Sequence, residues 1–113
     1  MIDDYHFGSI TINDQNYTND VIVHGEKMLN ESWWRKEGHN LAIEDLSDLP
    51  DQFEVLVIGN GHDGVCTVPE ETVDFVKNKG VEVIVQMTGE ATETFNRLLK
   101  EGKDVVGAFH LTC

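Results

Sequence analysis

The stretch Val55-Leu56-Val57-Ile58-Gly59-Asn60-Gly61-His62-Asp63-Gly64 decides the fold of this chain. Its first four residues form a continuous apolar run, which is typical of a strand whose two faces are both covered. Three glycines follow, and a histidine stands between the second and the third. A glycine-rich segment at this point predicts a loop with an accessible backbone directly after the strand. What this loop faces therefore decides where a functional site is expected.

Two more apolar segments follow the loop, and a helical pattern precedes each of them. They cover residues 81–85 and 105–109 and predict buried strands of the same kind. Pro69 suits the first turn of one helix, and Gly80 is placed to end it. Thr88 is the predicted N-cap of a second helix. The order strand–helix–strand–helix–strand predicts parallel pairing with right-handed crossovers.

The first half of the chain predicts an antiparallel meander instead. Residues 7–12 alternate in polarity, and residues 17–23 have the composition of a second strand. Residues 13–16 between them are typical turn residues. These two strands are expected to form a hairpin that extends the parallel sheet or packs against it.

A further short strand is expected at 32–35, where the adjacent Trp33 and Trp34 must then point to opposite faces. Apolar residues at spacing three predict a short helix over 43–49, which Pro50 ends. The predicted fold is therefore α/β: an N-terminal antiparallel meander joined to a C-terminal βαβαβ parallel unit, with helices packed on a mixed sheet, in a single domain over residues 1–113.

The charge balance limits the partners of this domain. It has 8 Lys and Arg residues against 21 Asp and Glu residues, a formal net charge of -13. Nucleic acid and anionic membrane surfaces are therefore excluded as partners. The acids solubilise the surface or attract a basic partner or a cation. The N-terminus resembles no secretory signal and no apolar run can span a bilayer, so a cytoplasmic location is expected.

The loop matches the pattern G-x-G-x-x-G, in which a backbone approaches the pyrophosphate of a dinucleotide at a helix N-terminus. The next helix, however, is expected to begin only near Pro69, and no acid follows the second strand to bind a ribose. The glycines are therefore interpreted as a sharp exit from the sheet, and no cofactor is predicted.

The carboxyl ends of parallel strands meet at one edge of a sheet, which is where α/β domains bind ligands. The loop and the tail after Phe109 should share this edge, bringing His62, Cys66, His110 and Cys113 to it. Their spacing matches no common zinc module, so no metal is predicted. A nucleophilic Cys113 is disfavoured because the adjacent terminal carboxylate would raise the pKa of its thiol.

Arg35 is a rare cation in this chain and lies beside two tryptophans. It can stack on an indole or bind a carboxylate or phosphate, and the alternative is a surface ion pair with one of many acids. The candidate ligand-binding residues are Arg35, Gly59, Asn60, Gly61, His62, His110 and Cys113.

Several stretches together resemble one known family. They are Phe7-Gly8-Ser9-Ile10, Trp34-Arg35 with Gly38-His39, Val57-Ile58-Gly59-Asn60-Gly61, and Phe109-His110-Leu111-Thr112-Cys113. In this order they resemble the Mth938-like domain family, small proteins of unknown function. The resemblance implies a compact single α/β domain. Relatives in that family include a mitochondrial complex I assembly factor and an adipogenesis-associated protein, and no established catalytic residues transfer.

Two hypotheses about function follow. The favoured one is a non-enzymatic binding or assembly module that recognises a protein partner or a second copy of the chain, because the sequence offers no convincing acid–base pair. The alternative is a small-molecule or anion-binding protein, enzymatic or not, that uses the glycine loop together with Arg35 and His110.

Overall fold

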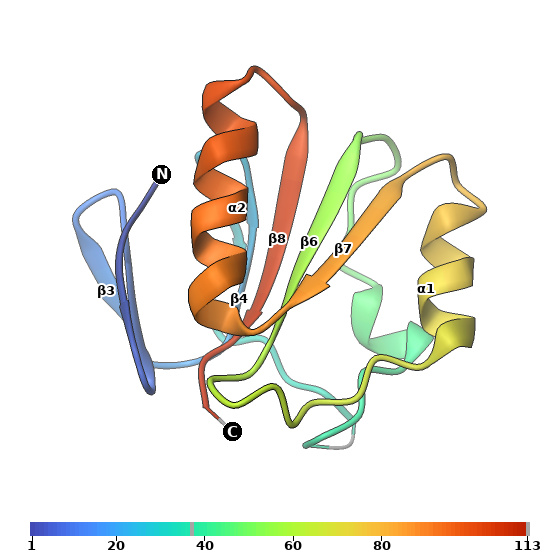
Figure 1. Cartoon of the computed structure of the whole chain (residues 1–113), viewed down its shortest axis with the longest axis horizontal. Coiled ribbons are helices and arrows are strands. Elements are labelled where there is room, and N and C mark those ends of the chain that lie inside the picture. Colours follow the sequence, from blue (N-terminus) through green and yellow to red (C-terminus); the bar gives the residue numbers. More distant parts are fainter. Residues whose placement is uncertain (37, 113) are drawn as a thin grey trace.

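The computed structural model describes residues 1–36 and 38–112, whose strands form two sheets (Figure 1). The smaller sheet has the order β1-β2-β3: β1 (Ile2–His6), β2 (Ser9–Ile12) and β3 (Gln15–Tyr17). The larger sheet has the order β5-β4-β8-β6-β7: β5 (Lys27–Asn30), β4 (Val21–His24), β8 (Val105–His110), β6 (Val55–Asn60) and β7 (Glu82–Gln86). Within the described parts of the chain, no helix is long and apolar enough to cross a bilayer.

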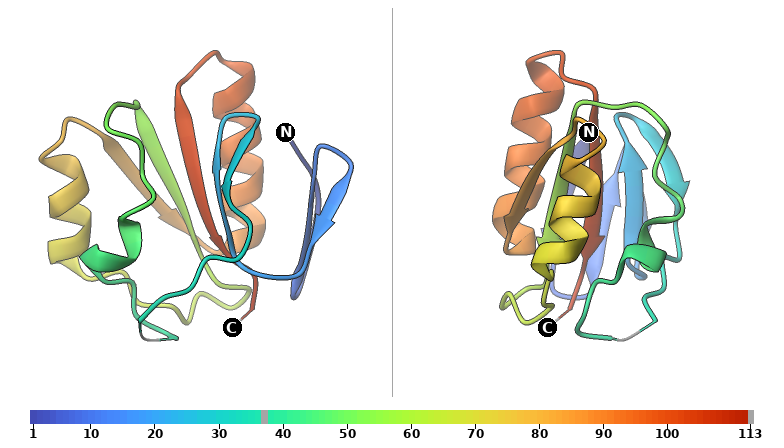
Figure 2. Two further views of the ribbon diagram at one scale, coloured as in Figure 1. Left: turned by 180° about the vertical axis from the view of Figure 1, so that it is seen from behind. Right: turned by 90° about the vertical axis from the view of Figure 1, so that its right-hand side faces the viewer.

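The second half of the chain forms the predicted parallel unit, but the buried strand predicted over 81–85 is an edge strand, β7, whose residues are exposed or half-buried. β6 lies between β7 and β8 and pairs with both in parallel. The crossovers are α1 (Glu70–Lys77) and α2 (Thr88–Lys100), which lie on opposite faces of the sheet (Figure 2). β4 then pairs with β8 in the antiparallel direction and makes the sheet mixed. The predicted fold class is confirmed.

Two hydrophobic cores cover the two faces of the larger sheet, which explains why β6 and β8 are apolar without alternation. On one face, Phe95 of α2 packs edge-on against Phe109, their ring centroids 5.7 Å apart, and the small sheet contributes Ile10. On the other face, Val76 of α1 joins the core that contains Trp33. Every strand residue of β6 from Val55 to Gly59 is buried as a result.

The first half of the chain differs from its prediction. Tyr17 ends β3 in the small sheet and Val21 begins β4 in the large one, so the single strand predicted over 17–23 is wrong. The hairpin turn is tighter than expected, because Asn13 and Asp14 both adopt positive φ, at 51° and 68°. Asparagine and aspartate tolerate this conformation, and two such residues suit the twist of a two-residue hairpin.

The strand predicted at 32–35 is also wrong, because these residues form no ladder. Their two tryptophans nevertheless lie as expected, with Trp33 in the core and Trp34 exposed. The short helix predicted after them is a single 3₁₀ turn, η1 (Ile43–Leu46). The irregular segment that contains residues 32–35 passes over the carboxyl edge of the large sheet and places Arg35 there.

Candidate functional site

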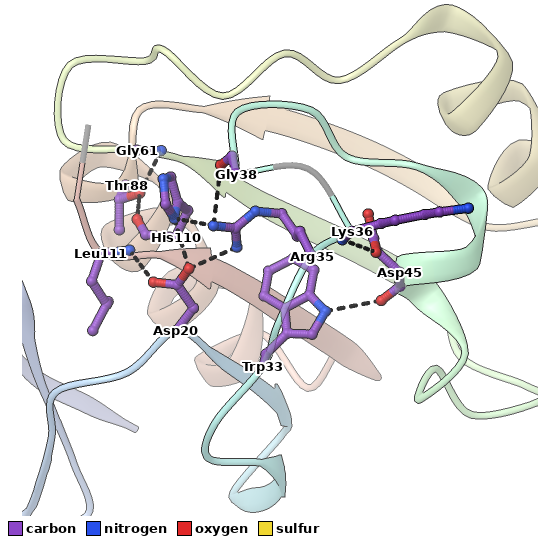
Figure 3. Close-up of polar contacts among 10 residues, drawn as sticks. All are labelled: Asp20, Trp33, Arg35, Lys36, Gly38, Asp45, Gly61, Thr88, His110 and Leu111. Carbon is purple, nitrogen blue, oxygen red and sulfur yellow. Dashed lines mark hydrogen bonds and ion pairs between the residues drawn. The ribbon is translucent and has the colours of Figure 1, made fainter.

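Three polar side chains from distant parts of the chain meet at the end of β8 (Figure 3). His110 is the last residue of β8. Asp20 lies just before β4, and because Val21 pairs with Phe109 in the antiparallel direction, Asp20 is placed opposite His110. Arg35 reaches both from the segment after β5. We refer to these residues as the Asp20–Arg35–His110 cluster.

The cluster is held by short polar contacts. Arg35 Nη1 donates to Asp20 Oδ2 at 2.7 Å, and the Leu111 amide donates to Asp20 Oδ1 at 2.8 Å. His110 Nδ1 lies 2.7 Å from Asp20 Oδ2 and 2.8 Å from Arg35 Nη2. The side chains of Arg35, Asp20 and His110 are only 7%, 15% and 6% exposed. A largely shielded, part-buried ion pair therefore lies at this edge of the sheet.

Asp20 is ionised at neutral pH. Burial by itself raises the pKa of its carboxyl group, but hydrogen bonds from His110 and the Leu111 amide, together with the Arg35 guanidinium, outweigh burial and hold this pKa below its ordinary value. An ionised carboxylate can only accept hydrogen bonds. The short contact to His110 therefore places a proton on Nδ1 of the histidine.

Three buried polar atoms near this edge have no hydrogen-bond partner among residues 1–36 and 38–112. They are Arg35 Nε, His110 Nε2 and Asn60 Oδ1. Asn60 is the register partner of His110 on β6, so both side chains project from the same face of the sheet. Buried polar atoms in folded proteins almost always have a partner, and such exceptions are typical of functional sites.

A cavity of about 430 Å³ opens beside the cluster, and all three of its side chains line it. Trp33 forms one wall, with the Arg35 Cζ atom 5.2 Å from its ring centroid. The indole of Trp33 is fixed by a 2.9 Å hydrogen bond from Nε1 to the Asp45 carbonyl. Trp34 lines the same cavity and is 79% exposed, so it offers an uncovered aromatic face to a bound molecule.

The glycine loop lies next to the tail after β8, as expected from parallel pairing. Its amide groups point inward: Gly61 N donates to Thr88 Oγ1 at 3.0 Å, and His62 N donates to the Thr112 carbonyl at 3.2 Å. Gly64 N donates within the loop, to the Gly61 carbonyl at 3.3 Å. The Gly61 and His62 amides thus join the loop to α2 and to the tail after β8.

Thr88 does not cap α2, and that prediction is wrong: the N-cap is Met87. The Thr88 hydroxyl instead donates to the His110 carbonyl at 2.5 Å while it accepts from the Gly61 amide. Thr88 therefore fastens the loop to the end of β8. It also explains Gly59, because a Cβ there would lie 2.8 Å from Thr88 Oγ1 and 3.1 Å from Thr88 Cα.

The predicted site residues separate into two groups. Arg35, Asn60 and His110 lie at or beside the cluster. His62 lies elsewhere: its Nδ1 is 3.1 Å from the Tyr5 hydroxyl, and its ring meets Phe7 edge-on at 5.4 Å. It lines a second cavity of about 530 Å³, between β1 and α2.

Only one of the two cysteines is among the described residues. Cys66 is buried in the core on the α1 face, and Cys113 lies outside the described residues. No group of three or more His, Cys, Asp or Glu side chains in the described ranges is arranged to hold a metal ion.

The sequence patterns do not single out Asp20, which is the centre of the cluster. An acid ahead of a strand is common, and nothing in its neighbours marks this one. Only the pairing of β4 with β8 brings it to His110. As a whole, the site can donate hydrogen bonds from a fixed guanidinium and accept one at a histidine nitrogen.

Solved structures with this fold are known. The crystal structure of PH1505, a conserved hypothetical protein of Pyrococcus horikoshii OT3, has a TM-score of 0.82 at 24% identity, over 100% of this chain and 99% of that one. A structure named MT938 has a TM-score of 0.81 at 27% identity, over 100% and 98% of the two chains. The solution structure of a Bordetella pertussis protein, described as a Mth938-like domain, has a TM-score of 0.78 at 21% identity, over 98% and 85%.

The sequence also matches a family over nearly its whole length. The match covers residues 2–110, and the family is described as a protein of unknown function (DUF498/DUF598). The chain belongs to this family, and its likeness to MT938 and to a Mth938-like domain confirms the resemblance seen in its sequence.

Proposed function

We propose that this domain is a non-enzymatic binding module that takes a small polar molecule into the cavity beside the Asp20–Arg35–His110 cluster. The observation that carries the proposal is the pair of unused nitrogens on two side chains that line this cavity. Arg35 and His110 are each more than nine-tenths buried, yet Arg35 Nε and His110 Nε2 have no partner among the described residues. A bound molecule can supply the missing hydrogen bonds when the side chains around these two atoms shift, because neither atom is exposed in the free structure.

Energetics support a functional rather than a structural role for the cluster. A buried ion pair is often no more stabilising than apolar side chains of the same shape, because both charges lose their hydration. A buried polar atom without a partner costs about 1–3 kcal/mol more. Compared with apolar side chains of the same shape, the cluster thus adds little stability to the free protein, and recognition of a ligand is a reason to keep it.

The cavity also has the size and lining of a small-molecule site. Its volume of about 430 Å³ falls within the range of about 300–1,000 Å³ that is usual for ligand pockets. Trp33 and Trp34 supply aromatic surface beside the polar cluster. This combination suits a molecule that has one polar end and one planar or apolar end.

A fragment screen by NMR tests the proposal. Binders are expected to shift the amide signals of Asp20, Arg35 and Leu111 and the indole signal of Trp34. The exposed Trp34 can be replaced without disturbing the core, and Trp34→Ala should weaken these fragments by about fivefold, from the loss of about 1 kcal/mol of aromatic contact. Phe7→Ala is the matched control, because Phe7 is 60% exposed and does not line this cavity.

Hits that leave all four signals unmoved, or that bind equally to the wild type and Trp34→Ala, would contradict the proposal. A screen without hits would do so as well.

A protein partner is the second candidate, favoured by apolar side chains exposed around the glycine loop. Phe7 packs on His62, and Met87 lies against Gly64, where a Cβ would be 3.2 Å from the Met87 Cγ. Both are large exposed hydrophobic residues, as is Val65. If a second copy covers this surface, sedimentation equilibrium should detect a dimer that strengthens from 0.05 to 0.5 M NaCl, as salt screens the acidic surfaces. Phe7→Ser should weaken that dimer, and a monomer at every concentration would exclude self-association.

A further inference from the structure

We infer that the ligand of this cavity carries a carboxylate, which the Nε–Nη2 edge of Arg35 holds, and that it binds together with one proton, which His110 takes up at Nε2. This inference rests on the proposed function and specifies the chemistry of the same site. It follows from the hydrogen-bond partners that the cluster already has and from those that it lacks.

The first step is the state of His110. Its Nδ1 atom is 2.7 Å from Asp20 Oδ2 and 2.8 Å from Arg35 Nη2. An unprotonated nitrogen at 2.7 Å from an ionised carboxylate would be strongly repelled, so Nδ1 carries the proton and donates it to Asp20. In the neutral ring, Nε2 is then an acceptor without a proton, and it has no partner among the described residues.

The second step is the set of donors that Arg35 has left. Nη1 is used by Asp20 at 2.7 Å. With the proton on His110 Nδ1, Arg35 Nη2 lies 2.8 Å from that nitrogen without donating to it, and the acceptor that it has among the described groups is the Gly38 carbonyl, at a long 3.4 Å. Nε has none. The Nε–Nη2 edge of the guanidinium therefore makes only one long hydrogen bond to described residues, while Nη1 binds Asp20.

The third step is the shape of that edge. Nε and Nη2 present two parallel N–H groups, the geometry that binds the two oxygens of one carboxylate. The plane of the guanidinium is held by Asp20 on one side and by the ring of Trp33, 5.2 Å from Cζ. Because the plane is fixed in advance, little conformational freedom is lost when the carboxylate binds.

The fourth step is charge. Arg35 and Asp20 cancel one another, so a carboxylate alone would add a buried negative charge to a chain whose net charge is already -13. Protonation of His110 removes this cost. Among residues 1–36 and 38–112, the charged side chains in contact with the ring are Asp20, from the segment before β4, and Arg35, from the segment after β5.

The groups that the other described elements place at the ring are neutral. Asn60 faces it from β6, and the Thr88 hydroxyl of α2 bonds the His110 carbonyl and not the ring. Asp20 therefore stabilises the imidazolium ion, and Arg35 opposes it until the bound carboxylate neutralises the guanidinium. His110 therefore takes up a proton when the carboxylate ligand binds.

Phenylacetate and its neutral analogue phenylacetamide test this inference on the wild-type protein. The two differ only in the acid group, and the phenyl ring can lie against Trp34. Isothermal titration at pH 6, 7 and 8, in phosphate and in Tris, reports the protons that bind with each compound. Phenylacetate should take up close to one proton at pH 8, and its affinity should fall as the pH rises from 6 to 8, by at most about tenfold per pH unit. Phenylacetamide should take up none.

The ¹⁵N signals of the imidazole provide a direct view of the same event. In the free protein at pH 8, Nδ1 of His110 should be protonated and Nε2 should not. With saturating phenylacetate both should be protonated. His110→Gln should abolish the proton uptake, whereas His24→Gln should leave it intact, because His24 pairs with Asp104 away from this cavity. Isothermal titration and the ¹⁵N signals test proton uptake by His110 on the wild type even if His110→Gln does not fold.

Binding of phenylacetate without proton uptake, or amide affinity equal to or above that of the acid at every pH, would overturn the inference. If only the amide binds and Trp34 responds, the inference fails while the proposed function stands. If neither compound binds, the inference fails, and an empty fragment screen would then remove the proposed function too.

Discussion

Gly59 occupies the point where β6 passes the first turn of α2, and it has no room for a side chain. A Cβ would lie within 3.1 Å of both the Thr88 backbone and the Phe109 ring. We expect Gly59→Ala to lower the free energy of unfolding by about 1–3 kcal/mol, the usual cost of overpacking, as measured by urea denaturation. Gly89→Ala is the control, because its nearest neighbour is 4.0 Å away, so a comparable loss there would show that the effect is not steric.

Asp20 should make the stability of this protein depend on acid. Its folded-state pKa is below the ordinary value, so its contribution is fully present above about pH 4 and is lost as the pH falls through the folded-state pKa. At pH 7, Asp20→Asn leaves Arg35 buried without its carboxylate, and a loss of about 3 kcal/mol is expected. The difference between variant and wild type should shrink at acid pH in urea titrations.

Asp51→Asn changes an exposed carboxyl group and serves as the control for this series. A loss for Asp20→Asn that stays constant from pH 7 to pH 2 would contradict the role given to the ion pair.

The sequence identifies single residues of the site where the residue type is unusual for its surroundings. Arg35 stood out as an unusual cation beside two tryptophans, and His110 stood out at the end of an apolar strand. Asp20 could not be found in this way, since its role depends on the register of β4 against β8, which links positions 90 residues apart. The sequence predicts the wrong role for Thr88, because a threonine at a helix start resembles a cap whatever its hydroxyl binds.

At the scale of elements, the sequence predicts a strand correctly where both faces of that strand are covered. The apolar runs of β6 and β8 allow only one interpretation, and the helices between the strands have clear ends and one apolar face. The N-terminal half was harder because Tyr17 and Val21 belong to different sheets. Residues 18–20 connect the two sheets. Their path depends on side-chain contacts that no local sequence pattern predicts.

Asn96 of α2 joins the small sheet to the rest of the fold. Its amide accepts from Ile2 N at 2.9 Å and donates to the Ile2 carbonyl at 2.7 Å, in place of a neighbouring strand. Loss of these bonds in Asn96→Ala should cost about 1–2 kcal/mol. Hydrogen exchange should quicken at β1 more than at β6, because the change releases the small sheet locally.

Asn16→Ala is the matched control, since the Asn16 amide bonds only exposed hydroxyl groups on β2. Equal acceleration of exchange in all strands of Asn96→Ala would show that the small sheet does not open separately.

Charge acts on the molecule as a whole. A net charge of -13 in a chain of 113 residues is expected to destabilise the compact state through self-repulsion. Raising NaCl from 0.02 to 0.5 M shortens the screening length from above 10 Å to below 8 Å, so the melting temperature should rise. The double variant Glu31→Gln and Asp51→Asn removes two exposed charges and should show a smaller rise. A melting temperature that falls with NaCl would contradict self-repulsion.

The central place of β8 also bears on how the protein is made. In the described part of the chain, β8 lies between β4 and β6 and joins the antiparallel edge of the large sheet to its parallel part. It is also the last of the elements to leave the ribosome. A nascent chain that has reached Lys100 therefore holds both halves of the sheet without the strand between them, and its apolar edges stay open until residues 105–110 emerge. Folding of this domain must then follow, rather than accompany, synthesis of its sheet.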